Sequence, residues 1–417
     1  MGSGQALQVH SSRLWDSLME LAQIGATAKG GVRRLALSDL DRQARDLVIH
    51  WFREAGLSVR IDQIGNIFAR REGLEPELSA VATGSHIDTQ PSGGKFDGNY
   101  GVLAGLEVLR TLNDAGIQTK RALEVCIWTN EEGSRFTPVM MGSGVWAGAF
   151  SLEHALESKD AEGIRVMDAL EAIGYMGPTP CGPSANHPSY HAYFEAHIEQ
   201  GPVLEDANIT IGEVLGALGQ RWFDVRITGM DAHAGPTPMA LRQDALLGAA
   251  HLIQEVNRIA LQSAPHGRGT VGSLRVSPNS RNVIPGFVHC TVDFRHPELS
   301  GLNAMEDRLK AFAIRLEKEL RLEIEIDKVT EFPPCQFAAP CLDAIRDAAK
   351  TLNLSSMPIV SGAGHDAVYV ARQSPSAMIF IPCKDGISHN EIEDALPEHI
   401  EAGANVLLGA MLRVAQG

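Results

Sequence analysis

The order of strand and helix patterns between residues 221 and 329 constrains the fold of this chain most. Apolar residues recur with strand or helix spacing in six segments: strands at 221–228, 270–277, 287–294 and 322–329, helices at 243–260 and 302–320. The resulting strand-helix-strand-strand-helix-strand order is that of a ferredoxin-like unit. Outside this block, strand and helix patterns alternate, which is typical of an α/β domain. We therefore predict an α/β domain with a mixed, mostly parallel sheet, formed by residues 1–218 and 333–417. A ferredoxin-like βαββαβ domain, residues 219–332, is inserted into it.

Length, charge and cysteine content restrict the function further. A chain of 417 residues exceeds one ordinary hydrophobic core, which agrees with two domains. The net charge of −15 argues against nucleic acid or an anionic membrane as the main partner. The six cysteines include no Cys-x-x-Cys pair, and no segment is long enough to span a bilayer. These features predict a cytoplasmic protein, and we assign no role to residues 1–4.

A stretch rich in glycine and ligand-type side chains follows the apolar run at 78–82, which predicts a buried strand. The strand leads to His86, and Asp88 points to the same side of an extended chain two residues later. A glycine-rich loop then presents Asp97. This arrangement suits a metal ion, because the imidazole can ligate, one carboxylate can orient it and the other can ligate or bridge. A polar turn between a strand and a helix is the alternative interpretation.

Other polar residues also follow predicted strands. Glu131 and Glu132 come after one strand, His197 ends another, and His389 lies in the loop after a third. Singly, each is more often a solvated carboxylate or a structural histidine. Ligands of α/β sheets gather at the carboxyl ends of strands, however, and two His with several carboxylates can hold two divalent ions. Neighbouring extended side chains point to opposite sides, so Glu131 and Glu132 should differ in role, one as ligand and one as general base.

The motifs together resemble the dinuclear metallopeptidase and amidohydrolase family M20, over about residues 10–415. They are Gly-Ser-His-x-Asp, Asp-Gly, Asn-Glu-Glu-Gly, His-x-Glu-Gln-Gly, Gly-x-x-Ala-His-Ala-Gly and a late Ser-His-Asn. The strings Asn-Glu-Glu-Gly-Ser-Arg-Phe, Asp-Phe-Arg-His-Pro and Gly-Ala-Gly-His-Asp are similar to its hydantoinase/carbamoylase subgroup. This subgroup contains N-carbamoyl-L-amino-acid hydrolases, fungal-type β-ureidopropionases and allantoate amidohydrolases.

The resemblance implies two divalent ions per subunit that share one carboxylate. The expected ligands are His86, Asp97 and His197 for the first ion, and Asp97, Glu132 and His389 for the second. Glu131 would be the general base, and Asp88 would orient His86. Zinc, manganese, cobalt or nickel would suit these nitrogen and oxygen ligands. A metal-binding scaffold without turnover is the alternative outside enzymes, but such a scaffold would not need Glu131.

The resemblance also implies a set of substrate-binding residues: Gln200, His233, Asn282, Arg295, Gly364 and His365. Arg295 would hold a carboxylate with its planar fork. His233 would also be catalytic, because the matching family residue reaches a site across the dimer interface and stabilises the oxyanion. The inserted domain would then be both a lid and the interface of a homodimer. Without the family context, Arg295 is a surface arginine and His233 a turn histidine.

The expected reaction is metal-dependent hydrolysis of the ureido C–N bond of N-carbamoyl amino acids. The substrate would be an N-carbamoyl-L-α-amino acid or N-carbamoyl-β-alanine, and the products the amino acid, carbon dioxide and ammonia. Hydrolysis of allantoate is the alternative within the subgroup, and a dipeptidase or aminoacylase activity is a weaker one. The expected partner is therefore a small ureido acid, with neither nucleic acid nor membrane.

Overall fold

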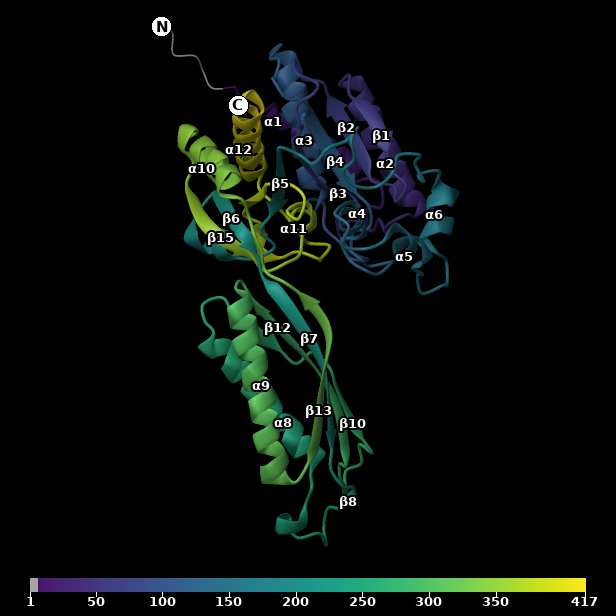
Figure 1. Ribbon diagram of the computed structural model, residues 1–417, viewed down its shortest axis with the longest axis vertical. Helices are drawn as coiled ribbons and strands as arrows, with labels where there is room; N and C mark the ends of the chain where they lie inside the picture. Colours follow the sequence, from purple (N-terminus) through teal and green to yellow (C-terminus); the bar gives the residue numbers. More distant parts are fainter. Residues whose placement is uncertain (1–6) are drawn as a thin grey trace. The chain divides into compact units, whose positions relative to one another are not determined.

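The computed structural model describes residues 7–417, so residues 1–4 lie outside the described part. The chain divides into two compact units (Figure 1). The first unit comprises Met1–Gly216 and Gln336–Gly417, and the second comprises Ala217–Cys335. The second unit is therefore a single segment of sequence that interrupts the first.

The first unit is built on a mixed nine-stranded sheet with the order β1-β2-β4-β3-β5-β16-β6-β14, in which β15 pairs with β6. Its strands are β1 (Ser58–Ile61), β2 (Ile67–Arg71), β3 (Val81–His86), β4 (Leu123–Trp128), β5 (Ala192–Ile198), β6 (Ile211–Ala217), β14 (Cys335–Gln336), β15 (Ser356–Ser361) and β16 (Ser376–Ile381). The central strands β4, β3, β5 and β16 are mutually parallel, and β1, β2 and β6 pair antiparallel with their neighbours. The predicted mixed α/β sheet with a parallel centre is thus confirmed.

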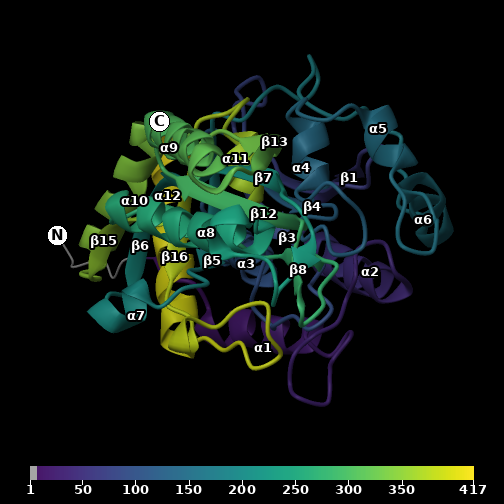
Figure 2. The same ribbon diagram turned by 90° about the horizontal axis from the view of Figure 1, so that it is seen from below.

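Helices cover this sheet on both faces (Figure 1, Figure 2). One layer contains α1, α3, α10 and α12, which pack on one another, and α4 and α11 form a second group that also contacts the sheet. The helices of this unit are α1 (Ser11–Leu21), α2 (Asp39–Glu54), α3 (Asn99–Asp114), α4 (Met141–Trp146), α5 (Leu152–Glu157), α6 (Val166–Ile173), α7 (Val203–Ala207), α10 (Ala339–Thr351), α11 (Asp366–Val370) and α12 (Pro397–Gln416), with a 3₁₀ turn η2 (Lys384–Gly386). Burial on both faces explains why β4 and β16 are almost continuously apolar.

The second unit has the predicted ferredoxin-like order. Its antiparallel strands run β10-β12-β7-β13, β9 also pairs with β12, and β8 and β11 form a separate two-stranded sheet. Its elements are β7 (Gly219–Thr228), β8 (Ala232–His233), η1 (Met239–Leu241), α8 (Ala245–Gln262), β9 (Arg268–Thr270), β10 (Leu274–Ser277), β11 (Val283–Ile284), β12 (Phe287–His296), α9 (Leu299–Leu320) and β13 (Glu323–Phe332). Alternate residues of β7, such as Phe223, Val225 and Ile227, form the core with α8 and α9.

One predicted strand of the second unit is wrong in detail. The segment 270–277 is two strands, because pairing stops between Thr270 and Leu274. The interruption contains Gly272, and a glycine weakens a strand because it has no side chain to pack. The two pieces pair with different parts of β12: Thr270 lies opposite Asp293, whereas Leu274 lies opposite Cys290.

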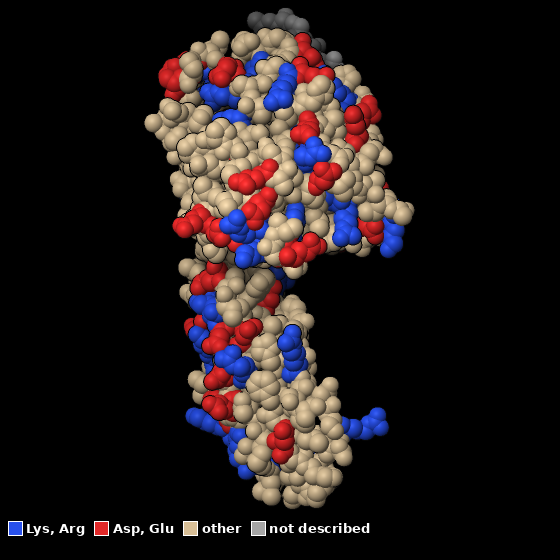
Figure 3. Space-filling view, turned by 90° about the vertical axis from the view of Figure 1, so that its right-hand side faces the viewer, with Lys and Arg blue, Asp and Glu red and all other residues tan. Residues whose placement is uncertain are grey.

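Within residues 7–417, the structure contains no helix that is both long enough and apolar enough to cross a membrane. Acidic and basic side chains are interspersed on the face shown in Figure 3. That face therefore lacks the one-sided basic stripe that marks nucleic-acid-binding surfaces.

Candidate metal centre

The five predicted ligand residues lie at one edge of the central sheet. His86 is the last residue of β3, His197 is next to last in β5, Glu132 follows β4, and His389 lies in the loop after β16. Asp97 directly precedes the turn into α3. Because β3, β4, β5 and β16 are parallel, their carboxyl ends meet at the same edge, where ligands of α/β sheets bind.

Three of these side chains form a buried group of ligand atoms. Nε2 of His197 lies 3.1 Å and Nε2 of His86 lies 3.6 Å from Oδ1 of Asp97. These residues are only 1%, 2% and 4% exposed, respectively. Two atoms bound tetrahedrally to one zinc-sized ion lie about 3.4 Å apart. The spacing of His86, Asp97 and His197 therefore fits a single divalent ion.

A second group of ligand atoms uses the other oxygen of Asp97. Nε2 of His389 lies 3.4 Å from Oδ2 of Asp97 and 3.3 Å from Oε2 of Glu132. Asp97 thus presents one oxygen to each group, which is the arrangement of a bridging carboxylate. The His389 side chain is 51% exposed, so this second group is open to solvent.

Hydrogen bonds fix the orientation of the two buried imidazoles. Nδ1 of His86 lies 2.9 Å from the main-chain oxygen of Asp88, and Nδ1 of His197 lies 2.9 Å from that of Ile198. A carbonyl oxygen can only accept, so Nδ1 carries the proton and Nε2 faces Asp97. The turn is equally constrained, since a Cβ at Gly98 would lie 2.4 Å from the His86 ring.

The electrostatics of this group favour bound positive charge. Burial by itself lowers the pKa of His86, but Glu131, Asp97 and Asp88 outweigh it and raise that pKa well above its ordinary value. Burial likewise opposes ionisation of Asp97, yet hydrogen bonds from the three histidines hold its pKa well below its ordinary value. The converging carboxylates attract protons where a divalent ion would supply the same charge. Geometry and donor chemistry therefore both fit metal ions.

The adjacent glutamates have different surroundings. Glu132 is held by Gln90, whose main-chain N donates to Oε1 at 3.1 Å and whose Nε2 donates to Oε2 at 2.7 Å. Oε2 of Glu131 instead lies 3.5 Å from Nε2 of His86. Burial raises the pKa of Glu131 well above its ordinary value. Glu132 therefore belongs to a group of possible metal ligands, whereas Glu131 lies beside His86 and belongs to neither group.

Asp88 acts on its neighbours through different atoms from those expected. Its main-chain carbonyl orients His86, and its carboxylate lies 3.9 Å from Nδ1 of that histidine. The carboxylate instead accepts hydrogen bonds of 3.3 Å from the main-chain N of both Glu131 and Glu132. Asp88 therefore links the loop after β3 to the loop after β4. Burial raises the pKa of this carboxylate to about 6.

Three predicted substrate-binding residues lie in the first unit, two of them beside this cluster. Nε2 of Gln200 donates to Oδ2 of Asp97 at 3.0 Å, and its buried Oε1 has no hydrogen-bond partner. The ring of His365 packs on that of His197 with centroids 4.6 Å apart. Burial lowers the pKa of His365 well below its ordinary value, which favours the neutral form of this ring. The third residue, Gly364, faces Met140: a Cβ there would lie 2.9 Å from the Met140 methyl group.

The other three predicted substrate-binding residues lie in the second unit. His233 and Asn282 are side by side, because His233 pairs with Val283 and Ala234 N donates to the main-chain oxygen of Asn282. Arg295 lies near the end of β12, where its Nε and Nη2 donate to Oδ2 of Asp293 at 3.2 and 3.0 Å. The structure therefore groups His233 with Asn282 and separates both from Arg295.

Sequence reasoning did not find several residues that position the cluster. Besides Gln90, these include Glu393, whose Oε1 accepts from the main-chain N of Phe96 and Asp97. Burial and the charge of Asp97 raise the pKa of Glu393 to about 7. The fully buried Arg34 donates to the main-chain oxygen of Ile87 and to Oδ1 of Asn99. These hydrogen bonds hold both ends of the loop that contains Asp97. In the sequence, only the glycine pair before Asp97 indicated such contacts, because a glycine allows other atoms to approach the backbone closely.

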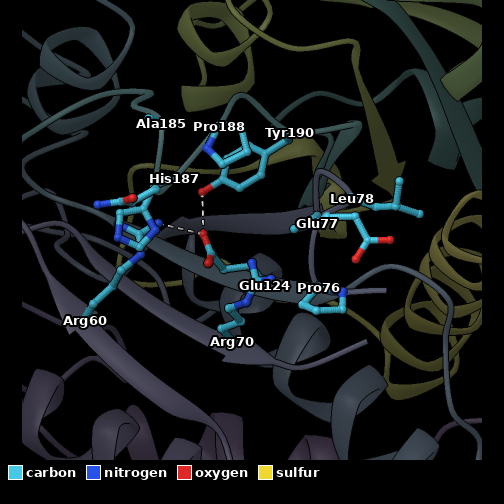
Figure 4. A pocket seen from close by; sticks show the side chains of 12 residues that line it. Arg60, Arg70, Pro76, Glu77, Leu78, Glu124, Ala185, His187, Pro188 and Tyr190 are labelled. Carbon is cyan, nitrogen blue, oxygen red and sulfur yellow. Dashed lines mark hydrogen bonds and ion pairs between the residues drawn. The ribbon is translucent and has the colours of Figure 1, made fainter. Parts of the chain in front are cut away.

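Another hollow of the first unit lies at the opposite, amino ends of the central strands (Figure 4). Glu124 lies inside it and accepts from the hydroxyl of Tyr190 at 2.6 Å and from Nη2 of Arg60 at 2.9 Å. Its charge is therefore already paired. Among residues 7–417, side chains that could hold a metal ion form the two groups described above and a third of Glu195, His197 and His365, and none of the three uses a residue of this hollow.

Comparison with known proteins identifies the family of this chain. The sequence pattern of peptidase family M20/M25/M40 matches residues 82–413. The N-carbamoyl-L-amino-acid amidohydrolase of Rhizobium meliloti is 46% identical over 99% of this chain and 98% of the relative. A ureidoglycolate hydrolase of Oryza sativa is 38% identical over 99% of this chain and 86% of the relative. The crystal structure of a hydantoinase/carbamoylase family amidase from Burkholderia multivorans has a TM-score of 0.95 and 54% identity, covering 99% of this chain and 100% of that one. This chain belongs to peptidase family M20/M25/M40.

Proposed function

We propose that this protein hydrolyses the ureido C–N bond of N-carbamoyl-L-amino acids in a site that holds two divalent ions. The observation that carries this proposal is the placement of Asp97, whose two carboxylate oxygens face different groups of ligand atoms. The amidohydrolase of Rhizobium meliloti, 46% identical over nearly the full length, supports the substrate class.

His86, Asp97 and His197 would hold the first ion, and Asp97, Glu132 and His389 the second. When bound, zinc, manganese, cobalt or nickel ions in this site would polarise a carbonyl group and lower the pKa of water. The buried imidazoles are already oriented by main-chain carbonyls, so the chain loses little conformational entropy on binding the ions.

Glu131 is the proposed general base. Its carboxylate is next to the ligand groups but is not needed to complete either. It takes a proton from the water that attacks the ureido carbonyl and delivers a proton to the departing nitrogen. Burial raises the pKa of Glu131 above its ordinary value, which favours the protonated form that donates to the departing nitrogen. In the overall reaction, one water molecule and one N-carbamoyl amino acid give one amino acid, one carbon dioxide and one ammonia.

Substrate recognition is proposed for both units. Arg295 would hold the carboxylate of the amino acid, since its fork already binds the carboxylate of Asp293 in the same way. Gln200 offers the unpartnered Oε1 as an acceptor for the ureido NH₂ group. His365 and Gly364 would line the site near His197.

His233 and Asn282 are proposed to serve the site of a second subunit. Within one chain they lie next to β11, before β12 begins, whereas Arg295 lies near the end of β12. An extended strand from residue 287 to 295 spans about 27 Å, far more than a small ureido acid. One chain therefore cannot offer all three residues to one substrate. A homodimer formed through the second unit would bring His233 of one subunit to the oxyanion in the other.

Ureidoglycolate is a second candidate substrate, because the rice relative named a ureidoglycolate hydrolase is 38% identical over 99% of this chain. Ammonia release by the metal-loaded enzyme distinguishes the candidates. We expect the highest kcat/KM on an N-carbamoyl-L-α-amino acid, with lower values on N-carbamoyl-β-alanine, ureidoglycolate and allantoate. A higher kcat/KM on either of the last two would move the assignment to ureide hydrolysis.

A cytoplasmic location is also proposed. Four cysteines, Cys126, Cys290, Cys341 and Cys383, are buried free thiols. Free thiols are typical of a reducing compartment. Fractionation of the source cells should recover the activity with cytoplasmic markers, and recovery outside the cytoplasm would contradict the proposal.

A further inference from the structure

Glu393 connects two loops that are far apart in the sequence. It is 1% exposed and lies four residues after His389, in the loop that follows β16. Its Oε1 accepts from the main-chain N of Phe96 at 3.0 Å and of Asp97 at 3.1 Å. Its Oε2 accepts from Oγ of Ser388 at 2.9 Å. One carboxylate thus holds the backbone of Asp97 and the residue next to His389.

The glycine-rich loop before Asp97 is shaped around this carboxylate. A Cβ at Gly94 would lie 2.0 Å from Oε1 and 2.1 Å from Cδ of Glu393. Any other residue at position 94 would therefore displace Glu393 or the loop. This contact gives a physical reason for a glycine at Gly94, and it shows that Glu393 is built into the loop rather than resting on its surface.

Ser388 connects Glu393 to the carboxylate of Asp97. Its Oγ lies 2.9 Å from Oε2 of Glu393 and 3.1 Å from Oδ2 of Asp97, the oxygen that faces His389. A hydroxyl has one proton, so it can donate to only one of the two carboxylates. A side chain at position 393 could accept hydrogen bonds from the main-chain N of Phe96 and Asp97 and donate one to Ser388. The Ser388 hydroxyl could then donate its own proton to the carboxylate of Asp97.

We infer that Glu393 is a positioning residue that sets the second metal position by tying the Asp97 loop to the His389 loop. This inference rests on the proposed pair of ions. The first position has other support, because His86 and His197 are buried and each is held by a main-chain carbonyl. His389 is half exposed and has a left-handed backbone with φ of 54°. His389 itself contacts Asp97 at 3.4 Å, and the link from Glu393 through Ser388 holds the residue next to it in place.

Titration of the metal-free chain with Zn²⁺, followed by calorimetry in the absence of substrate, tests this role. Loss of a group that orients a metal ligand typically weakens metal affinity about 10- to 100-fold. We expect Glu393→Ala to weaken the second Zn²⁺ by about this factor and to leave the first within about threefold. Glu393→Gln should bind both ions nearly as the wild type does. Its amide oxygen accepts from Phe96 and Asp97, and its NH₂ donates to Ser388, which keeps its proton for Asp97.

Two further variants make the test selective. Glu213→Ala is the matched control, because Glu213 is also buried and accepts from a serine hydroxyl, that of Ser356 at 2.7 Å, but lies on β6 away from both groups of ligands. It should bind Zn²⁺ as the wild type does. Ser388→Ala keeps the backbone grip of Glu393 and should weaken only the second ion. Where circular dichroism shows that Glu393→Ala is unfolded, Ser388→Ala and Glu393→Gln decide the question.

Two tight Zn²⁺ ions in Glu393→Ala, or in Ser388→Ala where the former is unfolded, would overturn the inference alone. So would a Glu393→Gln chain that loses the second ion, since Glu393 would then act through its charge rather than through its geometry. A wild-type chain that binds fewer than two Zn²⁺ ions would instead overturn the proposed function, and this inference with it.

Discussion

The predicted metal ligands of the first unit and the predicted substrate-binding residues of the second unit differ strongly in burial and in the hydrogen bonds that hold them. His86, Asp97 and His197 are almost fully buried, and each has its ligand atom aimed by a hydrogen bond or a close contact. His233 is exposed, and it accepts a hydrogen bond from Gly235 N two residues away. The Arg295 side chain is 32% exposed and rests on Asp293. Packing within the first unit thus fixes the predicted metal ligands, whereas the predicted substrate-binding residues of the second unit are more exposed.

The largest effect is expected at Asp97, because it serves both groups of ligands. Asp97→Ala should abolish activity, whereas His86→Ala and Glu132→Ala each remove a ligand from only one proposed ion. Metal affinity and residual kcat/KM should therefore both fall furthest in the Asp97 variant. Equal losses in the three variants would argue against a bridging carboxylate.

Glu131 separates catalysis from metal binding. Glu131→Gln should lower kcat by about 10²- to 10⁴-fold, the usual contribution of a general base, while both ions stay bound. Glu132→Gln is the matched neighbour and should lose affinity for the second ion. Elemental analysis beside kinetics tests this pair, and an equal loss of metal from both variants would contradict the division of roles.

His233 tests whether the second unit supplies a catalytic group. His233→Ala should lower kcat by about 10²- to 10³-fold, as loss of an oxyanion donor does, without change in metal content. Mixing this variant with Glu131→Gln should restore activity if the subunits of a dimer exchange, up to about a quarter of the wild-type value for random pairing. Absence of recovery despite demonstrated exchange would place His233 in its own chain's site or in none.

Arg295 should have the smallest effect of these residues, and chiefly on KM. A carboxylate is held similarly in the substrate and in the transition state, so the loss appears in binding. A charge-assisted pair contributes roughly 1.5–3 kcal/mol, so Arg295→Ala should raise KM about 10- to 150-fold with little change in kcat. A fall in kcat with unchanged KM would instead assign Arg295 to the chemical step.

The sequence predicted the elements whose signal is local. The predicted strand 287–294 lies within β12, and the predicted helix 302–320 lies within α9. The strand before the metal loop was placed at 78–82, whereas β3 runs from Val81 to His86. The polar end of β3 concealed its true length, because its Thr, Gly, Ser and His residues are buried by tertiary packing and not by apolar character.

Residues that position others were harder to predict. Glu393 and Gln90 look like ordinary loop residues, and their function depends on contacts with chain segments 42 or more residues away. No spacing rule connects positions 96 and 393. The sequence also could not show which atoms of Asp88 contact His86, because the main-chain carbonyl and the carboxylate of Asp88 compete for the same imidazole nitrogen. The ligand types could be read from the sequence, but the atoms that orient them could not.

The most direct test of the two-ion site is the metal content of fully active enzyme, measured by elemental analysis together with specific activity during chelation and reconstitution. We expect the fully active enzyme to contain two divalent ions per chain. It should lose activity as the ions are removed and recover it when zinc, manganese or cobalt is added back. Full activity in a preparation without divalent metal, or with only one ion per chain, would contradict it.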